Sequence, residues 1–313
     1  MTTALNASSP TVAILLCTYQ GEAFLAQQLD SIANQTHRNW RVYASDDGST
    51  DRTRAILEAY QAQWGADCLR VTDGPQRGYA ANFLTLLCRD AIQADFYAYC
   101  DQDDLWEPDK LERAMRCVSP LPVETPALYA SRTRLIDAVG ASLGLSPRFT
   151  QPPAFANALV QSIGGGNTML FNETARQLLK SAGVAGVPAH DWWTYLVVSG
   201  CGGTVLYDPH PGVQYRQHVK NQMGTNRGFS ARFTRARMLF GGHFRAWNTR
   251  NLAALHALRP QLTLKNRKTL DTFTAVRSDN LFTRLAALRR SGVYRQTFGG
   301  NLGLFVAACG KKL

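Results

Sequence analysis

The chain has 313 residues, of which 45% are hydrophobic and 18% are charged, and its formal net charge is +11. This composition is typical of a globular protein, and no apolar run reaches the ~20 residues that cross a bilayer as a helix. The first ten residues lack the basic and apolar regions of a secretory signal, and the seven cysteines show no CxxC spacing, so we expect a cytoplasmic protein without disulfides or a zinc site.

The first hundred residues alternate strand-like and helix-like segments. Continuous apolar runs with β-branched residues predict strands over 11–19, 40–47, 68–74 and 95–100. Helical spacing of apolar residues predicts helices over 22–35, 49–64 and 78–91, the second with Ser49 or Thr50 as its N-cap. Strands that alternate with helices of this length favour βαβ units and a parallel sheet.

Acidic residues follow two of these predicted strands. Asp46 and Asp47 end the second strand, and the stretch YCDQDDLWEPDKL places Asp101, Asp103 and Asp104 after the fourth. Ligands of parallel α/β sheets bind beyond the carboxyl ends of the strands. We therefore expect both clusters to line one site, although they lie far apart in the sequence.

The second half shows a different pattern. We expect strands over 126–137 and 164–172, the latter entered through three glycines that either let the backbone approach a ligand or form a flexible turn. A helix is predicted over 189–203, followed by a strand, a turn and a short strand over 204–224. The segments 231–240, 248–259 and 279–296 interleave Arg with apolar residues at helical spacing, which predicts basic amphipathic helices.

Charge divides the chain unevenly. Residues 216–313 contain 19 Lys or Arg and two acids, whereas residues 1–215 have a net charge of −6. We expect residues 1–226 to form the main domain and residues 227–313 a basic helical extension. The extension either lies on an anionic membrane surface or packs on the main domain.

Each candidate motif has a structural and a functional interpretation. An Asp-x-Asp pair such as Asp101 and Asp103 can bind Mg²⁺ or Mn²⁺ beside a diphosphate, or it can be a solvated turn. Asp46 or Asp47 can accept hydrogen bonds from a nucleoside, or can stabilise an Asx-turn. The stretch HDWW (190–193) offers Asp191 as a general base with tryptophans for sugar stacking, or an N-cap with core tryptophans. The stretch YRQHVKN (215–221) offers Arg216 and Lys220 to phosphate and His218 to a metal, or surface side chains.

Taken in order, these motifs resemble family 2 glycosyltransferases with the GT-A fold. The resemblance rests on TVAILLCTYQGEAFLAQQLDSIANQTHRNWRVYASDDGSTDRT, YCDQDDLWEPDKL, GGGNTMLFN, HDWW and YRQHVKNQMG, and it covers about residues 11–226. The combination CDQDD, HDWW and YRQH resembles the bacterial subgroup of rhamnosyltransferases in surface-polysaccharide assembly. It implies an α/β fold with a Rossmann-like, mainly parallel sheet flanked by helices.

The resemblance also implies roles for single residues. Asp191 corresponds to the catalytic base, and His190 stands where many members of the family have Glu. His218 would join the metal or the diphosphate, beside Arg216. The nucleoside and the metal would be bound by Thr18, Tyr19, Asp46 and Asp47, and by Asp101 and Asp103 with Asp103 as the direct ligand of Mg²⁺ or Mn²⁺.

The implied reaction is transfer of one sugar with inversion. A QxxRW motif, found in processive synthases of the family, is absent after Asp191, which implies one sugar per encounter. The donor would be a dTDP- or UDP-linked sugar, with L-rhamnose implied by the subgroup and a UDP-hexose as the alternative. The acceptor would be a glycan or a polyprenyl-diphosphate-linked glycan at the inner face of the plasma membrane.

Two other classes of protein fit the sequence less well. A nucleic-acid-binding protein would use the basic residues after 216, but it would leave the clustered acids unexplained. A nucleotidyltransferase would want a glycine-rich basic loop near the first strand, whereas CTYQGEAFL has one glycine and no Lys or Arg.

Overall fold

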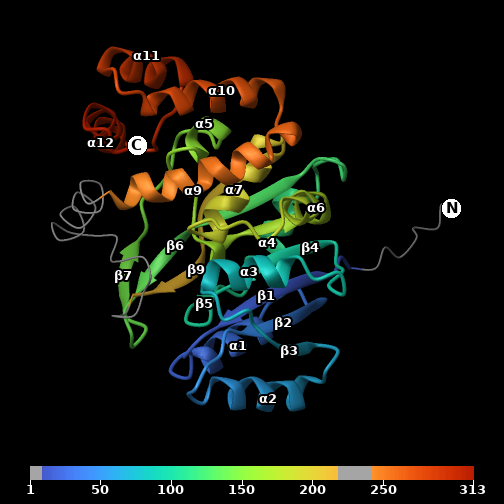
Figure 1. The fold of residues 1–313 in the computed structure, drawn as a ribbon. Helices are drawn as coiled ribbons and strands as arrows, with labels where there is room; N and C mark the ends of the chain where they lie inside the picture. The colour runs from blue at the N-terminus through green and yellow to red at the C-terminus, as the bar shows by residue number, and fades with distance from the viewer. Residues whose placement is uncertain (1–8, 218–241) are drawn as a thin grey trace.

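One mixed sheet organises the molecule. The computed structural model describes residues 9–217 and 242–313, and their strands form a sheet in the order β3-β2-β1-β4-β8-β6-β9-β5, with β7 paired to β6 (Figure 1). Strands β1 to β4 are mutually parallel where they pair, whereas β8 and β5 join antiparallel. The strands are β1 Val12–Thr18, β2 Trp40–Asp46, β3 Leu69–Asp73, β4 Phe96–Cys100, β5 Leu105–Trp106, β6 Ala127–Ile136, β7 Ser142–Leu145, β8 Leu170–Asn172 and β9 Thr204–Arg216.

The central strand β1 separates two hydrophobic cores. All seven of its residues are buried, as expected for a parallel strand covered on both faces. Because side chains alternate along a strand, Leu15 and Cys17 belong to one core while Ile14 and Leu16 belong to the other. This continuous apolar run is therefore what places the sheet in the middle of the fold.

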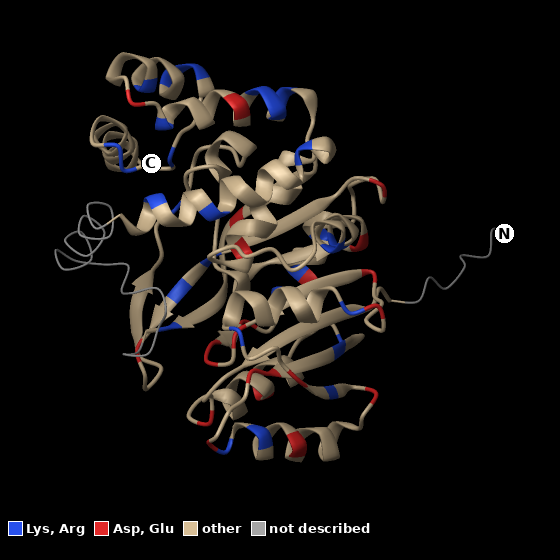
Figure 2. Ribbon diagram, viewed as in Figure 1, with Lys and Arg blue, Asp and Glu red and all other residues tan. Residues whose placement is uncertain are grey.

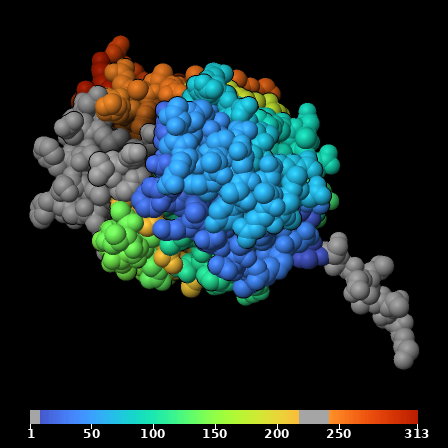
Figure 3. Space-filling model, turned by 90° about the horizontal axis from the view of Figure 1, so that it is seen from below, coloured from blue at the N-terminus to red at the C-terminus, as the bar shows by residue number. Residues whose placement is uncertain are grey.

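Helices cover both faces of the sheet. One core receives α1 (Leu25–Ala33), α2 (Thr53–Trp64) and α4 (Lys110–Val118), through residues such as Leu29, Leu57 and Leu111. The other receives α3 (Tyr79–Leu87), α6 (Glu173–Ala182) and α7 (His190–Gly200). Seen from below, α2 and its neighbours form the surface that covers this end of the molecule (Figure 3).

The second helix begins later than the sequence suggested. Its N-cap is Arg52, and neither Ser49 nor Thr50 caps it. Ser49 instead donates its hydroxyl to Asp46 Oδ1 at 2.6 Å and accepts a hydrogen bond from Gln20 N. The prediction was wrong because this serine connects the loops that follow β1 and β2, a contact that a local capping rule does not include.

Strand β9 is continuous where the sequence predicted a turn. It pairs in parallel with β6 along its whole length, and its register shifts between Ser131 and Thr133. Asp208 pairs with Ser131 and Pro211 with Arg132, so the residues between them bulge out of the ladder. A bulge accommodates prolines, which cannot donate to a ladder, and this explains why DPHPG does not end the strand.

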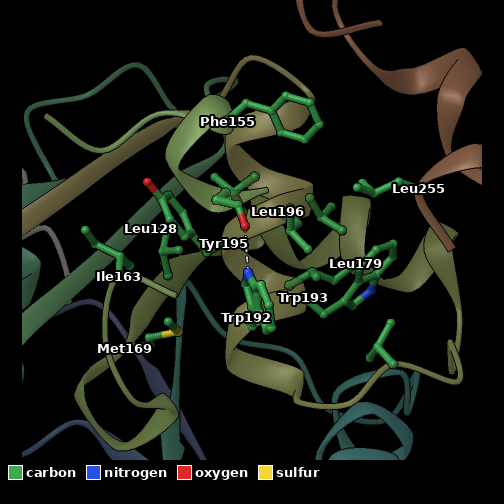
Figure 4. Packing of buried hydrophobic residues seen from close by; sticks show 14 of the residues in the cluster. Leu128, Phe155, Ile163, Met169, Leu179, Trp192, Trp193, Tyr195, Leu196 and Leu255 are labelled. Atoms are coloured by element: carbon green, nitrogen blue, oxygen red, sulfur yellow. Dashed lines mark hydrogen bonds between the residues drawn. The ribbon is translucent and has the colours of Figure 1, made fainter. Parts of the chain in front are cut away.

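The C-terminal helices pack on the sheet-and-helix body. They are α9 (His243–Ala257), α10 (Leu264–Thr274), α11 (Leu281–Ser291) and α12 (Phe298–Cys309). Leu255 of α9 lies in the same core as Trp193 and Leu196 of α7 (Figure 4). Arg250 of α9 donates to the carbonyl oxygens of Gly186 and Val187, in the loop that leads into α7. In the described residues the extension is thus attached to the body through a shared core.

For the C-terminal region the sequence prediction is partly untested and partly incomplete. The predicted helix over 231–240 and the boundary between 226 and 227 lie outside the described residues. Helices α10 and α12 were not predicted. In the described part of the chain, no helix is both long enough and apolar enough to cross a membrane.

Asn266 gives a stability test of this attachment. From the first turn of α10 its amide donates to the carbonyl oxygens of Ser199 and Gly200 at 3.0 and 2.9 Å, at the C-terminus of α7. Asn266→Ala removes both hydrogen bonds, while the carbonyls keep backbone donors in Gly202 N at 3.4 Å and Thr263 N at 3.2 Å, so the free energy of unfolding is expected to fall by about 1 kcal/mol. Chemical denaturation measures this, with Thr272→Ala on the same helix as control, since Thr272 bonds only Lys268 O of its own helix. Equal free energies of unfolding for Asn266→Ala and Thr272→Ala would contradict the role of Asn266 in attaching α10 to α7.

Candidate active site

The carboxyl ends of β1, β2 and β4 meet at one edge of the sheet. Thr18 at the end of β1 pairs with Asp46 at the end of β2, and Leu16 pairs with Cys100 at the end of β4. Asp101 follows directly after β4. The structure therefore brings together the two acidic clusters that the sequence placed at strand ends.

Asp46 and Asp47 organise the loops at this edge. Asp46 accepts hydrogen bonds from the Thr18 hydroxyl at 2.8 Å and from the backbone N–H of Ser49 at 2.9 Å. Asp47 accepts from the backbone N–H groups of Gln76 and Gly78. Thr18, Asp46 and Asp47 are buried, whereas the Tyr19 side chain is exposed. These contacts fix the loops around the predicted nucleoside site. The Tyr19 ring is exposed beside these loops.

Gln102 links the first loop to the Asp101–Asp104 turn. Its side-chain oxygen accepts from Tyr19 N at 2.8 Å, and its amide group donates to Tyr19 O at 2.9 Å. Gly21 lies against this pair, because a Cβ added there would be 2.3 Å from Gln102 Oε1. Gln102 pairs with backbone that is 83 residues away, a contact that the local sequence pattern does not indicate.

A double-mutant cycle tests this link. Gln102→Ala removes two hydrogen bonds and is expected to lower the free energy of unfolding by about 1–3 kcal/mol. Gly21→Ala displaces the Gln102 side chain and should cost a similar amount. The double variant should be little worse than either single variant, because both remove the same contact. Additive losses in chemical denaturation would contradict the assigned contact.

Four carboxylates lie in or near the turn after β4, those of Asp101, Asp103, Asp104 and Asp191. Burial and the neighbouring Asp104, Asp103 and Asp191 raise the pKa of Asp101 well above its usual range. Within residues 9–217 and 242–313 no three His, Cys, Asp or Glu side chains form a ready metal cage. Mg²⁺ requires only one or two protein carboxylates beside waters and phosphates. The carboxylate oxygens of the turn are hard donors of the kind that Mg²⁺ takes.

Asp104 anchors the turn to two later segments. Its Oδ1 accepts from Arg216 N at 3.0 Å, and its Oδ2 accepts from the Asn167 amide group. Burial and Asp103 raise its pKa to about 8. Arg216 is buried, and its guanidinium donates to Asp103 O, Ala138 O and Gln27 Oε1. Asp104 and Arg216 therefore fix the backbone around Asp103.

Asp191 lies in the first turn of α7, as the sequence predicted for this stretch. Its Oδ1 accepts from Trp192 N at 2.6 Å and its Oδ2 from Gly166 N at 3.2 Å. Burial raises the pKa of Asp191 to about 6, against these hydrogen bonds, which lower it. Trp192 and Trp193 are both buried in the core, so they do not offer faces for sugar stacking.

The glycine-rich loop connects the two acidic sites. Gly166 N donates to Asp191, and the next residue, Asn167, donates to Asp104. A Cβ at Gly166 would lie 2.4 Å from His190 Nε2, so this glycine allows close approach of the protein's own backbone. Two consecutive residues thus set the position of Asp191 relative to the Asp101–Asp104 turn.

His190 stacks on the Phe83 ring at 3.9 Å between centroids. It is buried, which lowers its pKa to about 3, so the imidazole is neutral. Neither ring nitrogen has a hydrogen-bond partner among the described residues. His190 therefore packs behind Asp191 as an uncharged ring.

Tyr79 lies near Asp191 and Asp101, and sequence reasoning missed it. Burial raises the pKa of its phenol, and the carboxylates of Asp191 and Asp101 raise it further. Its hydroxyl donates to Pro188 O at 2.8 Å, just before α7. The first position of α3 was its only signal in the sequence. His218 and Lys220 lie outside the described residues, so the suggested roles of both side chains remain predictions.

Comparisons with known proteins indicate the class of enzyme. Residues 13–120 match the family model described as Glycosyl transferase family 2. The dTDP-rhamnosyl transferase RfbG of Shigella flexneri is 28% identical over 235 residues, which are 70% of this chain and 77% of that protein. The putative glycosyltransferase EpsE of Bacillus subtilis is 31% identical over 106 residues, which are 34% of this chain and 37% of that protein.

Solved structures show the same fold. The mannosyltransferase PcManGT from Pyrobaculum calidifontis, in complex with GDP-Man and Mn²⁺, has a TM-score of 0.52 at 16% identity, covering 98% of this chain and 88% of that chain. Residues 1–349 of S. aureus TarS in complex with UDP-GlcNAc have a TM-score of 0.55 at 14% identity, covering 91% and 93%. The chain is therefore a glycosyltransferase with the GT-A fold, and its residues 13–120 match the model of family 2.

Proposed function

We propose that the protein transfers a single L-rhamnose from a dTDP- or UDP-linked donor to a hydroxyl of a glycan or lipid-linked acceptor, with inversion. One observation carries this: Gly166 and Asn167 connect a carboxylate with a raised pKa, Asp191, to the Asp101–Asp104 turn. These two contacts support an arrangement in which Asp191 would be the acceptor base and the Asp101–Asp104 turn would hold the diphosphate. The similarity to the Shigella flexneri protein named as a dTDP-rhamnosyl transferase supports the choice of sugar.

The chemistry follows from the roles of the side chains. Asp191 takes the proton of the acceptor hydroxyl as its oxygen forms a bond to the anomeric carbon. The bond from that carbon to the diphosphate oxygen breaks from the opposite face, and the nucleoside diphosphate leaves. Thr18, Asp46 and Asp47 keep the loops after β1 and β2 in place around the nucleoside. The exposed Tyr19 ring would lie beside the nucleobase.

Metal binding belongs to this proposal. Asp101 and Asp103 would hold Mg²⁺ or Mn²⁺, whose positive charge would stabilise the departing diphosphate. Asp104 keeps the turn in position through Asn167 and Arg216. In this arrangement Arg216 acts on the diphosphate site through the backbone of Asp103.

Donor hydrolysis is the first experiment. The protein is incubated with dTDP-rhamnose, UDP-GlcNAc, UDP-glucose or GDP-mannose, each with and without Mn²⁺, and released nucleoside diphosphate is measured. Metal-dependent release from dTDP-rhamnose alone is expected. Release from a UDP-hexose instead would show that the donor sugar is a hexose and not rhamnose, while the reaction would still be glycosyl transfer. If no donor is cleaved and calorimetry shows no metal-dependent binding of dTDP or UDP, the proposal fails.

The place of action is proposed to be the inner face of the plasma membrane, where lipid-linked acceptors are assembled. Cell fractionation with antibody detection tests it. Recovery in the membrane fraction that is released by high salt is expected, because a peripheral contact through basic residues is screened. Recovery only in the soluble fraction at low salt would contradict it.

A further inference from the structure

Helix α12 is apolar on two sides. It contains no charged residue from Phe298 to Cys309. One side, with Leu304, Ala307 and Ala308, is buried in the core. Phe298, 87% exposed, begins an opposite stripe that continues at helical spacing. The exposed stripe consists of Phe298, Leu302, Phe305, Val306 and Cys309.

Helix α11 packs against α12 and carries a further exposed aromatic side chain. Near its start, the Arg284 guanidinium donates to the carbonyl oxygens of Ala308 and Cys309, so the beginning of α11 lies at the end of α12. Phe282, 82% exposed, is at this end. We call Phe282 and the exposed stripe of α12 the apolar face. Apolar side chains that are exposed along a helix mark a candidate site of interaction.

The charges around the apolar face have one sign. Residues 242–313 carry 13 Lys or Arg and two acids, and positive residues predominate along these helices (Figure 2). Arg289 and Arg290 end α11 and are exposed, and Lys312 follows α12. The nearby acid Asp279 is paired with Lys311 Nζ at 2.6 Å. An apolar stripe flanked by exposed cations is the pattern that binds anionic lipid interfaces.

We propose that α11 and α12 form a docking face for an anionic phospholipid bilayer. With 12 residues, α12 is about 18 Å long and cannot cross the ~30 Å hydrocarbon core, so it lies along the interface. A second copy of the chain fits less well, because two such basic surfaces would repel each other. This inference rests on the proposed place of action and deepens it, since it names the surface that touches the membrane.

Vesicle sedimentation tests the proposal with the full chain. Binding to phosphatidylcholine vesicles that contain phosphatidylglycerol is expected, with weaker binding to pure phosphatidylcholine or at high salt. Each of Phe298→Glu and Phe282→Glu should weaken partition at least about tenfold, because a large apolar side chain no longer enters the bilayer. Arg289→Gln with Arg290→Gln should weaken it by about fivefold per charge, without changing the apolar face.

Val123→Glu is the matched control, since Val123 is 79% exposed in the catalytic half and lies on neither α11 nor α12. It should bind vesicles as the unchanged protein does. Unchanged donor hydrolysis and circular dichroism show that each variant folds. No binding by the unchanged protein, or equal loss in Val123→Glu, overturns the proposal. Vesicle binding without hydrolysis of any donor would refute the proposed function and leave the docking face standing.

A second measurement identifies what covers the apolar face. Cys309 lies on the stripe and Cys117 is exposed on α4, so each can carry an environment-sensitive dye in a variant that lacks the other thiol. A vesicle-dependent blue shift at Cys309 and not at Cys117 is expected. A blue shift at Cys309 without vesicles would overturn the proposal. If it rises with protein concentration a second copy covers the face, and if it does not, another segment of the chain does.

Discussion

Asp191→Asn is expected to lower kcat by about 10²–10⁴-fold, because the amide cannot take the proton of the acceptor hydroxyl. The change keeps the size of a side chain that is fixed by Trp192 N and Gly166 N. Binding of the nucleoside diphosphate should stay the same, since Asp191 is not assigned to the diphosphate. Steady-state kinetics with saturating donor, together with calorimetric titration of the diphosphate, measure both effects.

The pH profile gives an independent check on the base. Burial raises the pKa of Asp191 to about 6, and only the ionised carboxylate accepts a proton. Activity should therefore be full above this pKa and fall as the pH drops through about 6. An aspartate with an ordinary pKa would lose activity only near pH 4. The residual activity of Asp191→Asn should not fall as the pH drops through about 6.

Asp208→Asn is the matched control for this variant. Asp208 is a buried carboxylate outside the site, paired with Arg113 Nε at 2.5 Å and with the Tyr129 hydroxyl at 3.0 Å. Its loss should lower thermal stability and leave kcat nearly unchanged. If Asp191→Asn retains the kcat of the unchanged protein, another residue must act as the base.

Asp103→Ala is expected to abolish the metal dependence of the reaction. Removal of this carboxylate leaves Asp101 alone in the predicted Asp-x-Asp pair. Because the metal contributes several kcal/mol of charge stabilisation, activity should fall by at least about 100-fold. Calorimetry should show that Mn²⁺ no longer strengthens binding of dTDP or UDP. Asp109→Ala, in the same segment but at the N-cap of α4, should retain metal-dependent binding. Equal behaviour of the two variants would remove Asp103 from the metal site.

The sequence was sufficient to predict the first half of the fold. The apolar run of β1 predicted a strand buried on both faces, and the acids after β2 and β4 predicted a shared edge. Both predictions use only local pattern and the geometry of parallel sheets. The contacts that fix the site were beyond such reasoning, because Gln102 pairs with Tyr19 and Asp104 with Asn167 across long stretches of chain.

The C-terminal helices show a second limit of sequence reasoning. Helix α12 contains Gly299, Gly300 and Gly303, which lower intrinsic helix propensity, and it forms because Leu304 and Ala308 pack into the core. Helix α10 buries only Leu270 and Phe273, too few for a clear amphipathic pattern. In both cases tertiary packing determines the helix, and one sequence does not show which surface will receive it.

The anchoring of Asp104 has a consequence for synthesis of the protein on the ribosome. The loops after β1 and β2 can form as soon as β4 has emerged, but Asp104 receives its bond from Arg216 only 112 residues later. Chains grow at about 5–20 residues per second, so the bond from Arg216 follows Asp104 by on the order of ten seconds. Asn167 can reach Asp104 earlier, 63 residues after it. A nascent chain can therefore hold the loops around Asp46 and Asp47 well before the acidic turn has both of its anchors, and pairing of β9 supplies the second.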